Sequence, residues 1–166
     1  MTELAWIAEA RKHVGLSEKT TTGNATILSW LKELGGAWLG TDASKFAWCG
    51  VFIAHCLKSV GISYPQNWFR ALDYAKSGVK LTKPCYGCVA VKSRTGGGHV
   101  TFVVGQTKDG RLVCLGGNQS DKVCFAIYNQ SDFSAFMWYS KEAQPDNSRY
   151  NLPILTNVTA TGVTEA

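Results

Sequence analysis

The sequence predicts a single α+β domain in which helices come first and an antiparallel sheet follows. Apolar residues recur at helical spacing through the first sixty residues, whereas short apolar runs separated by Gly-containing turns follow residue 87. The length of 166 residues fits one domain, and a 45% hydrophobic content is sufficient for a core. Disorder throughout is therefore excluded. No apolar run is long enough to predict a membrane-spanning helix.

Three helices are expected in the first half of the chain. Apolar positions within residues 4–14 follow a helical repeat, which the polar stretch 17–24 interrupts. A second helix is predicted over residues 26–34 because Gly35-Gly36 is a stop signal. A loop containing Trp and Gly then covers residues 37–47.

The third helix has the clearest pattern and is predicted over residues 48–60, with Gly61 as its stop signal. Cys49 falls in its first turn and on the inward-facing stripe, whereas His55 lies off the stripe and is expected at an edge or exposed. The stripe consists of Cys49, Phe52, Ile53, Cys56, Leu57 and Val60.

The second half of the chain is predicted to form the sheet. Loops are expected at Gly-rich residues 96–98 and at 108–110. The composition becomes rich in Pro, Asn and Thr from Glu142, so residues 1–141 are interpreted as the domain and 142–166 as an extended or partly disordered tail. The expected strands are 88–91, 99–104, 112–115, 123–128 and, last, 136–139.

Cys49 is a candidate nucleophile because of its position. Unpaired N–H groups and the helix dipole at a helix start favour an anion, so both are expected to lower a thiol pKa. The same N–H groups are able to stabilise the oxyanion of an attacked carbonyl. The alternative for Cys49 is a buried cysteine of the apolar stripe, which is the interpretation favoured for Cys56.

His99 is the candidate general base. It follows three glycines and opens an apolar strand, from which an imidazole can reach a neighbouring helix start. A third polar group is needed to orient the ring, and Asn118 is the first choice, with Asp121 the second. The alternatives are a turn histidine without a partner and ordinary Gly-Gly-Asn turn chemistry.

These motifs, in this order, resemble the small papain-like peptidoglycan amidohydrolases of the CHAP and NlpC/P60 group, most closely single-domain phage endolysins. The resemblance covers roughly residues 1–140 and implies a papain-like fold. It implies Cys49 as nucleophile, His99 as general base and Asn118 as third member, with no metal and no cofactor. One departure is Cys88, which follows Gly87 where the family usually has an acidic residue. The motifs are Trp48-Cys49-Gly50-Val51-Phe52-Ile53, Gly98-His99-Val100 and Gly116-Gly117-Asn118-Gln119-Ser120-Asp121.

The implied activity is an endolysin-type peptidoglycan hydrolase that cleaves an amide bond of the murein peptide. Trp48, Gly50 and Asp121 are candidates for the oxyanion site and groove. Trp38 and Trp68 are further aromatic candidates for contact with sugar rings, with core packing as the alternative for each Trp. The expected partner is bacterial peptidoglycan, with no nucleic acid, no membrane insertion and a monomeric state.

The charge distribution agrees with an anionic partner. Residues 61–110 hold seven basic and two acidic side chains, and this excess of five positive charges equals the net charge of +5 of the whole chain. Lys92 and Arg94 directly precede the Gly loop, so they are expected to flank the groove. A plain solvated basic face is the alternative.

Other functions remain open at the level of sequence. An interbacterial amidase effector has the same chemistry, and a non-catalytic wall-binding module is a second alternative. The third is a metal-binding protein with zinc on Cys85, Cys88, Cys114 and Cys124, although their spacing is poor. No Sec-type signal is visible, so the expected product is made in a bacterial cytoplasm with reduced thiols and reaches the wall after holin-type release.

Overall fold

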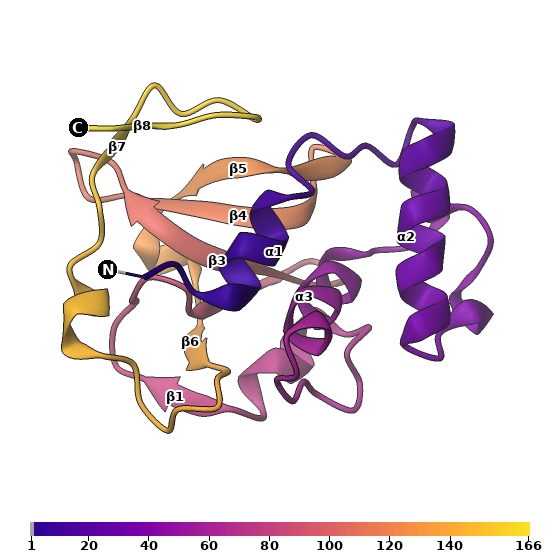
Figure 1. Ribbon diagram of the computed structural model, residues 1–166, viewed down its shortest axis with the longest axis horizontal. Helices are drawn as coiled ribbons and strands as arrows, with labels where there is room; N and C mark the ends of the chain where they lie inside the picture. The colour runs from indigo at the N-terminus through magenta and orange to yellow at the C-terminus, as the bar shows by residue number, and fades with distance from the viewer. Residues whose placement is uncertain (1) are drawn as a thin grey trace.

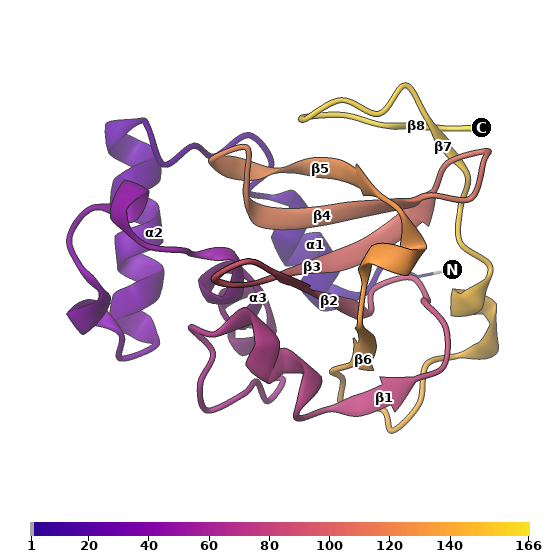
Figure 2. The same cartoon turned by 180° about the vertical axis from the view of Figure 1, so that it is seen from behind.

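The computed structural model describes residues 2–166 and confirms the α+β arrangement, with helices first and the sheet second. In Figures 1 and 2, α1 and α3 lie against one face of the sheet and α2 stands at one end. The three α-helices are α1 (Ala5–Arg11), α2 (Thr21–Glu33) and α3 (Cys49–Ser59). The 3-10 turns are η1 (Ala37–Leu39), η2 (Ala43–Lys45), η3 (Ala71–Ala75), η4 (Gln130–Asp132) and η5 (Asn147–Tyr150).

The main sheet has six strands in the order β1-β6-β2-β3-β4-β5, and all neighbours are antiparallel. The hairpins β2–β3 and β3–β4 place the predicted His99 strand at the centre, beside the strand that ends in the Gly-Gly-Asn segment. The strands are β1 (Val79–Leu81), β2 (Val89–Arg94), β3 (Gly97–Gln106), β4 (Leu112–Gln119), β5 (Lys122–Tyr128) and β6 (Ala135–Trp138).

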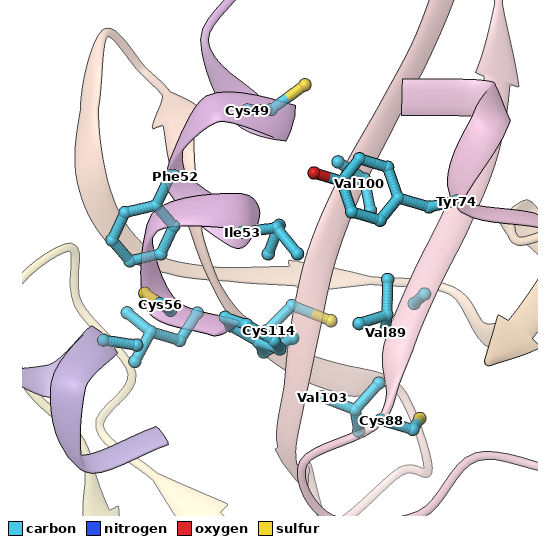
Figure 3. Packing of buried hydrophobic residues seen from close by; sticks show 14 of the residues in the cluster. Cys49, Phe52, Ile53, Cys56, Tyr74, Cys88, Val89, Val100, Val103 and Cys114 are labelled. Carbon is cyan, nitrogen blue, oxygen red and sulfur yellow. The ribbon is translucent and has the colours of Figure 1, made fainter. Parts of the chain in front are cut away.

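The apolar stripe of α3 packs on the sheet as its spacing predicts. Figure 3 shows Ile53 pointing from the helix toward the strands that carry Val89 and Val100, whereas Phe52 and Cys56 lie on another side of the helix. Every residue of α3 from Cys49 to Leu57 is buried, so this helix is the centre of the core. Only one face was expected to be buried, and His55 is also covered because α1 and α2 pack on the other side.

Two elements differ from the sequence prediction. Helix α2 begins at Thr21 rather than near residue 26, because the Thr20 hydroxyl accepts the Gly23 N–H at 2.9 Å and caps the helix. Strand β1 was not predicted, and it pairs with β6 at the edge of the sheet. A run of three residues is too short to show a clear alternation of apolar and polar side chains.

Residues 142–166 are extended, but they are docked on the domain by specific hydrogen bonds rather than being loose. The Tyr86 N–H donates to the Arg149 carbonyl at 2.7 Å, and the Gln106 N–H donates to the Pro153 carbonyl at 2.9 Å. The buried Leu155 belongs to β7 (Leu155–Thr156), which pairs with β8 (Thr164–Glu165). This hairpin lies at the end of the sheet away from α2 (Figure 1).

Candidate functional site

Cys49 is the first residue of α3, and the turn that precedes the helix is firmly held. The Tyr74 hydroxyl donates to the Gly50 carbonyl at 2.7 Å. Gly50 itself admits no side chain, because a Cβ there would lie 2.3 Å from the Trp68 carbonyl oxygen. The start of the helix is therefore positioned by close backbone packing, and the Cys49 side chain projects from it (Figure 3).

Glycine in β4 lets α3 approach the sheet closely. A Cβ at Gly117 would lie 2.7 Å from the Phe52 Cβ and 2.8 Å from an indole carbon of Trp48. Trp48 is fully buried, and its indole N–H donates to Glu18 Oε1 at 3.0 Å. Trp48 was a candidate for the groove, and the structure instead places it in the core, where it holds the helix start against the sheet.

The Cys49 thiol lies against β3 at the residue that follows His99. The backbone N–H groups of Val100, Gly50 and Cys49 favour the thiolate and act to lower the pKa of Cys49. Burial nevertheless raises the pKa of the Cys49 thiol above its ordinary value, and these N–H groups and the charge of Arg94 offset only part of that effect. The expectation of a lowered thiol pKa is therefore wrong for the resting protein, because desolvation outweighs the helix start.

The imidazole of His99 is oriented by the side chain of Gln119. The His99 Nε2–H donates to Gln119 Oε1 at 3.0 Å, and the Tyr128 hydroxyl donates to the same oxygen at 3.1 Å. The Gln119 NH₂ group donates to the Cys124 carbonyl at 2.7 Å, which fixes which end of the amide faces His99. An amide oxygen only accepts, so this network assigns the proton of the neutral imidazole to Nε2.

The second ring nitrogen of His99 is left free to act as a base. Nδ1 is buried and has no hydrogen-bond partner among the described residues. Burial lowers the pKa of His99 to about 4, with the nearby charges of Arg94 and Lys92 acting in the same direction and the Gln119 bond against it. In the resting protein Cys49 is thus a thiol and His99 a neutral imidazole, rather than a thiolate and an imidazolium.

The third polar group is Gln119 rather than Asn118 or Asp121, because of a β-bulge. His99, Thr101 and Val103 share a face of β3, and the register Val103↔Cys114 would bring position 118 opposite His99 in a regular ladder. The pairing of β4 with β5 shifts register between Gly116 and Gln119, so β4 carries an extra residue there and Gln119 points inward toward His99 instead.

The two residues predicted as orienters have other surroundings. Asn118 adopts a φ of 57°, is half-buried and lines a pocket beside Cys49. Asp121, with a φ of 64°, pairs with Lys19 at 3.3 Å and is about half exposed. The structure therefore brings Asn118 to the candidate site but places Asp121 in a turn pair with Lys19.

A pocket of about 480 Å³ opens beside Cys49. Two arginines, Arg70 and Arg94, line it, and the β2–β3 hairpin at residues 95–98 forms one wall. The other wall contains Phe69 and Leu72. This is a basic cleft with an apolar side, and it meets the thiol at the start of α3.

The aromatic candidates separate into rim and core. Trp38 is 64% exposed, and its ring lies edge-on to Phe69 with centroids 5.0 Å apart, so it extends the apolar wall outward. Trp68 is buried, and its ring lies edge-on to Phe69 with centroids 5.5 Å apart. The sequence did not single out Phe69, and no spacing rule would have marked it.

The four cysteines weighed as a zinc site do not assemble into one. Cys85, Cys88, Cys114 and Cys124 are buried free thiols, and within residues 2–166 they do not form a group of three or more converging ligands. The pKa of Cys88 and of Cys114 is raised well above the ordinary value by burial, which disfavours the thiolate that a metal requires.

Comparison of the chain with models of known protein families, with curated proteins and with solved structures finds no match. None of the described helices combines the length and the apolar character needed to cross a bilayer.

Proposed function

We propose that the protein is a cysteine amidohydrolase of papain-like type that cleaves an amide bond in the peptide part of bacterial peptidoglycan. One observation carries the proposal: the buried His99 has a fixed Nε2–H tautomer and a free Nδ1, and it directly precedes Val100, whose backbone N–H favours the thiolate of Cys49 at the start of α3. A structural histidine would be expected to satisfy both nitrogens. The free Nδ1 is the base that the thiol needs.

The proposed reaction begins with the neutral pair. His99 Nδ1 takes the thiol proton as the Cys49 sulfur attacks the amide carbonyl, so the thiolate and imidazolium form together on attack. The N–H groups of Cys49 and Gly50 stabilise the oxyanion, at roughly 3–4 kcal/mol for each well-placed donor. His99 then returns the proton to the leaving amine. Water, deprotonated by His99, attacks the thioester and releases the carboxylic acid and the free thiol.

Gln119 is suited to this cycle because its oxygen accepts the Nε2–H in both charge states of the ring. It holds the imidazole in place without adding a negative charge, so it orients His99 but does not stabilise the imidazolium as a carboxylate would. The base consequently stays weak and neutral until the thiol reacts.

The residues around the pocket are suited to a substrate that carries negative charge and is attached to sugar rings. Arg70 and Arg94 offer positive charge at the thiol, and stem peptides of peptidoglycan carry carboxylates. The exposed Trp38 beside Phe69 offers an aromatic face on which a sugar ring can stack. We place this activity in a phage-type lysin, with a secreted interbacterial effector as the alternative; a neighbouring holin or immunity gene distinguishes them.

Mass spectrometry of muropeptides tests the proposal. Purified sacculi treated with the wild-type protein are expected to yield new products from cleavage of one amide bond. One product carries the new free amine and the other carries the new free carboxylate. The Cys49→Ala variant is expected to yield none, and Cys56→Ala serves as the matched cysteine control and retains the products. Unchanged muropeptides with the wild-type protein contradict the proposal, and binding to sacculi without products would favour the non-catalytic wall-binding module.

A further inference from the structure

A second cluster of reactive side chains lies among the helices, away from Cys49. Glu9 of α1, His13 in the turn after α1 and His55 of α3 place one ligand atom each within 4.8 Å of one another. His13 Nε2 lies 2.8 Å and His55 Nε2 lies 3.1 Å from the same oxygen of Glu9, Oε2. Helices α1 and α3 are neighbours on one face of the sheet, which brings the three residues together (Figure 1).

The distances are compatible with a metal centre after a small adjustment. Two ligand atoms that bind a tetrahedral ion at 2.0–2.1 Å lie about 3.3 Å apart, so the two contacts with Glu9 would lengthen by a few tenths of an ångström. The ligand nitrogens of His13 and His55 lie within 4.8 Å of each other and would settle at the same separation. The side chains of Glu9, His13 and His55 are 16, 20 and 11% exposed, so a fourth position has access to water. Three protein ligands and one open position are a frequent zinc arrangement.

The surroundings of His55 provide an independent indication. Its other nitrogen, Nδ1, lies 2.5 Å from the carboxylate of Glu33, the last residue of α2. Histidines that bind metals usually donate their second N–H to a carboxylate, which turns the ligating nitrogen toward the ion and increases its basicity. The indole of Trp30 stacks on the His55 ring with centroids 4.7 Å apart and restrains its rotation.

The cluster also offers a carboxylate oxygen to a cation. The ring nitrogens of His13 and His55 both lie against Glu9 Oε2. Lys12 occupies the other oxygen, Oε1, at 3.2 Å and leaves Oε2 to the two histidines.

We infer that Glu9, His13 and His55 form a binding site for a divalent transition-metal ion such as Zn²⁺, with Glu33 as the outer carboxylate on His55. An ion there would join α1 to α3 and, through Glu33, to α2. The chemistry is independent of the proposed hydrolysis, because Glu9, His13 and His55 are not among the residues that line the cysteine pocket. The sequence predicted no metal, and the only metal site weighed was one of cysteines, because His55 lies more than forty residues from Glu9 and His13 in the chain.

Cobalt titration tests the site. The Cys49→Ser background is used because Cys49 lines a pocket and its thiol could bind cobalt itself. We expect one equivalent of Co²⁺ to bind, with d–d absorption but no thiolate-to-cobalt charge-transfer band, and to raise the melting temperature. His13→Gln is the diagnostic change, because residue 13 lies in a turn and the amide can still contact Glu9. It is expected to abolish saturable binding. Glu33→Ala is expected to weaken binding about 10- to 100-fold.

The third histidine provides the matched control, since the chain has three. His99→Gln removes a buried histidine outside the cluster and is expected to retain one bound Co²⁺. Binding that persists in His13→Gln, a thiolate charge-transfer band, or no saturable binding by the Cys49→Ser protein would each overturn the inference.

Discussion

A cysteine lies near each end of α3, and each is considered with a histidine: Cys49 with His99 of β3, and Cys56 with His55 of the same helix. The surroundings of the two histidines give them different chemistry. At the N-terminal end, Cys49 lies beside β3 and His99 contacts an amide, Gln119. Near the C-terminal end, Cys56 is fully buried, and His55 contacts two carboxylates, Glu9 and Glu33.

The difference shows how the partner of a histidine sets its role. An amide oxygen fixes the ring but adds no charge, so burial lowers the pKa of His99 to about 4 and leaves Nδ1 free. The carboxylates of Glu9 and Glu33 contact both ring nitrogens of His55, and their negative charge is one that a bound metal ion would balance. The neutral histidine therefore belongs to β3, beside the start of α3, whereas the histidine that contacts carboxylates belongs to α3 itself.

Removing each cysteine of α3 is expected to give the largest contrast. Cys49→Ala should lower peptidoglycan hydrolysis by about three orders of magnitude or more, since it deletes the nucleophile. Cys56→Ala should leave activity essentially unchanged and cost about 1 kcal/mol of stability, because it only removes a buried group. Release of soluble muropeptides and urea unfolding measure the two effects. Equal loss of activity in both variants would place the role of Cys49 in packing.

The pH dependence of stability should separate the two histidine environments. Between pH 6.5 and 4, the unfolded chain binds a proton at His99 that the folded protein does not, so the free energy of unfolding falls on acidification by about 3 kcal/mol. Ionised Glu9 contributes stability that is present above pH 4.5 and lost between about pH 4.5 and 2.

Urea unfolding across this pH range, followed by Trp fluorescence, measures both windows. His99→Gln should flatten the first window only, and Glu9→Gln the second only. An unchanged slope between pH 6.5 and 4 in His99→Gln would show that His99 is not held neutral by burial.

Exchanging the amide for a carboxylate should make the N-terminal site resemble the His55 site. In Gln119→Glu, a carboxylate 3.0 Å from Nε2 would raise the pKa of His99, so the acid limb of kcat/KM should move to higher pH. Gln119→Ala should lower kcat/KM about 10- to 100-fold, because the ring loses its orienting partner. Asn118→Ala is the neighbouring control and should leave the pH profile in place. A shift with Asn118→Ala but none with Gln119→Glu would restore Asn118 as the orienting residue.

The smallest effect is expected from charge at the pocket. Arg94 lines the pocket, whereas the Lys92 ammonium lies 4.9 Å from the ring centroid of Tyr128. The double variant Lys92→Gln/Arg94→Gln should bind sacculi a few-fold more weakly and show a shallower dependence on salt, because exposed charges are screened. Sedimentation of sacculi with bound protein at several salt concentrations measures this. Binding with the wild-type salt dependence would assign these charges to an ordinary solvated face.

The parts of the fold that periodicity controls were predictable. The stripe from Cys49 to Val60 predicts α3 within one residue at each end, and the alternating runs predict the hairpins that bring His99 beside β4. Gln119 was missed because a bulge reverses the facing of one residue, and nothing in Gly-Gly-Asn-Gln distinguishes a bulge from a turn.

The remaining errors concern properties that only tertiary packing creates. The direction in which the pKa of Cys49 shifts depends on burial by the surrounding chain, which raises the pKa and opposes the effect of the helix start. The burial of His55 requires Glu9 and Glu33 from two other helices. Trp48 was placed in the groove because an indole beside a nucleophile is ambiguous until its partner, Glu18, is known.

Alkylation of the six cysteines by iodoacetamide, followed by peptide mass spectrometry, tests the central claim most directly. In the folded wild-type protein, Cys49 is expected to react first, because it alone of the cysteines lines the pocket with Arg94 and because we propose that the free Nδ1 of His99 takes its proton. Its rate should fall in His99→Gln, while Cys56 and Cys88 stay unreacted in both proteins. Reaction of Cys56 or Cys88 as fast as Cys49, or a Cys49 rate that does not depend on His99, would contradict a Cys49–His99 catalytic pair.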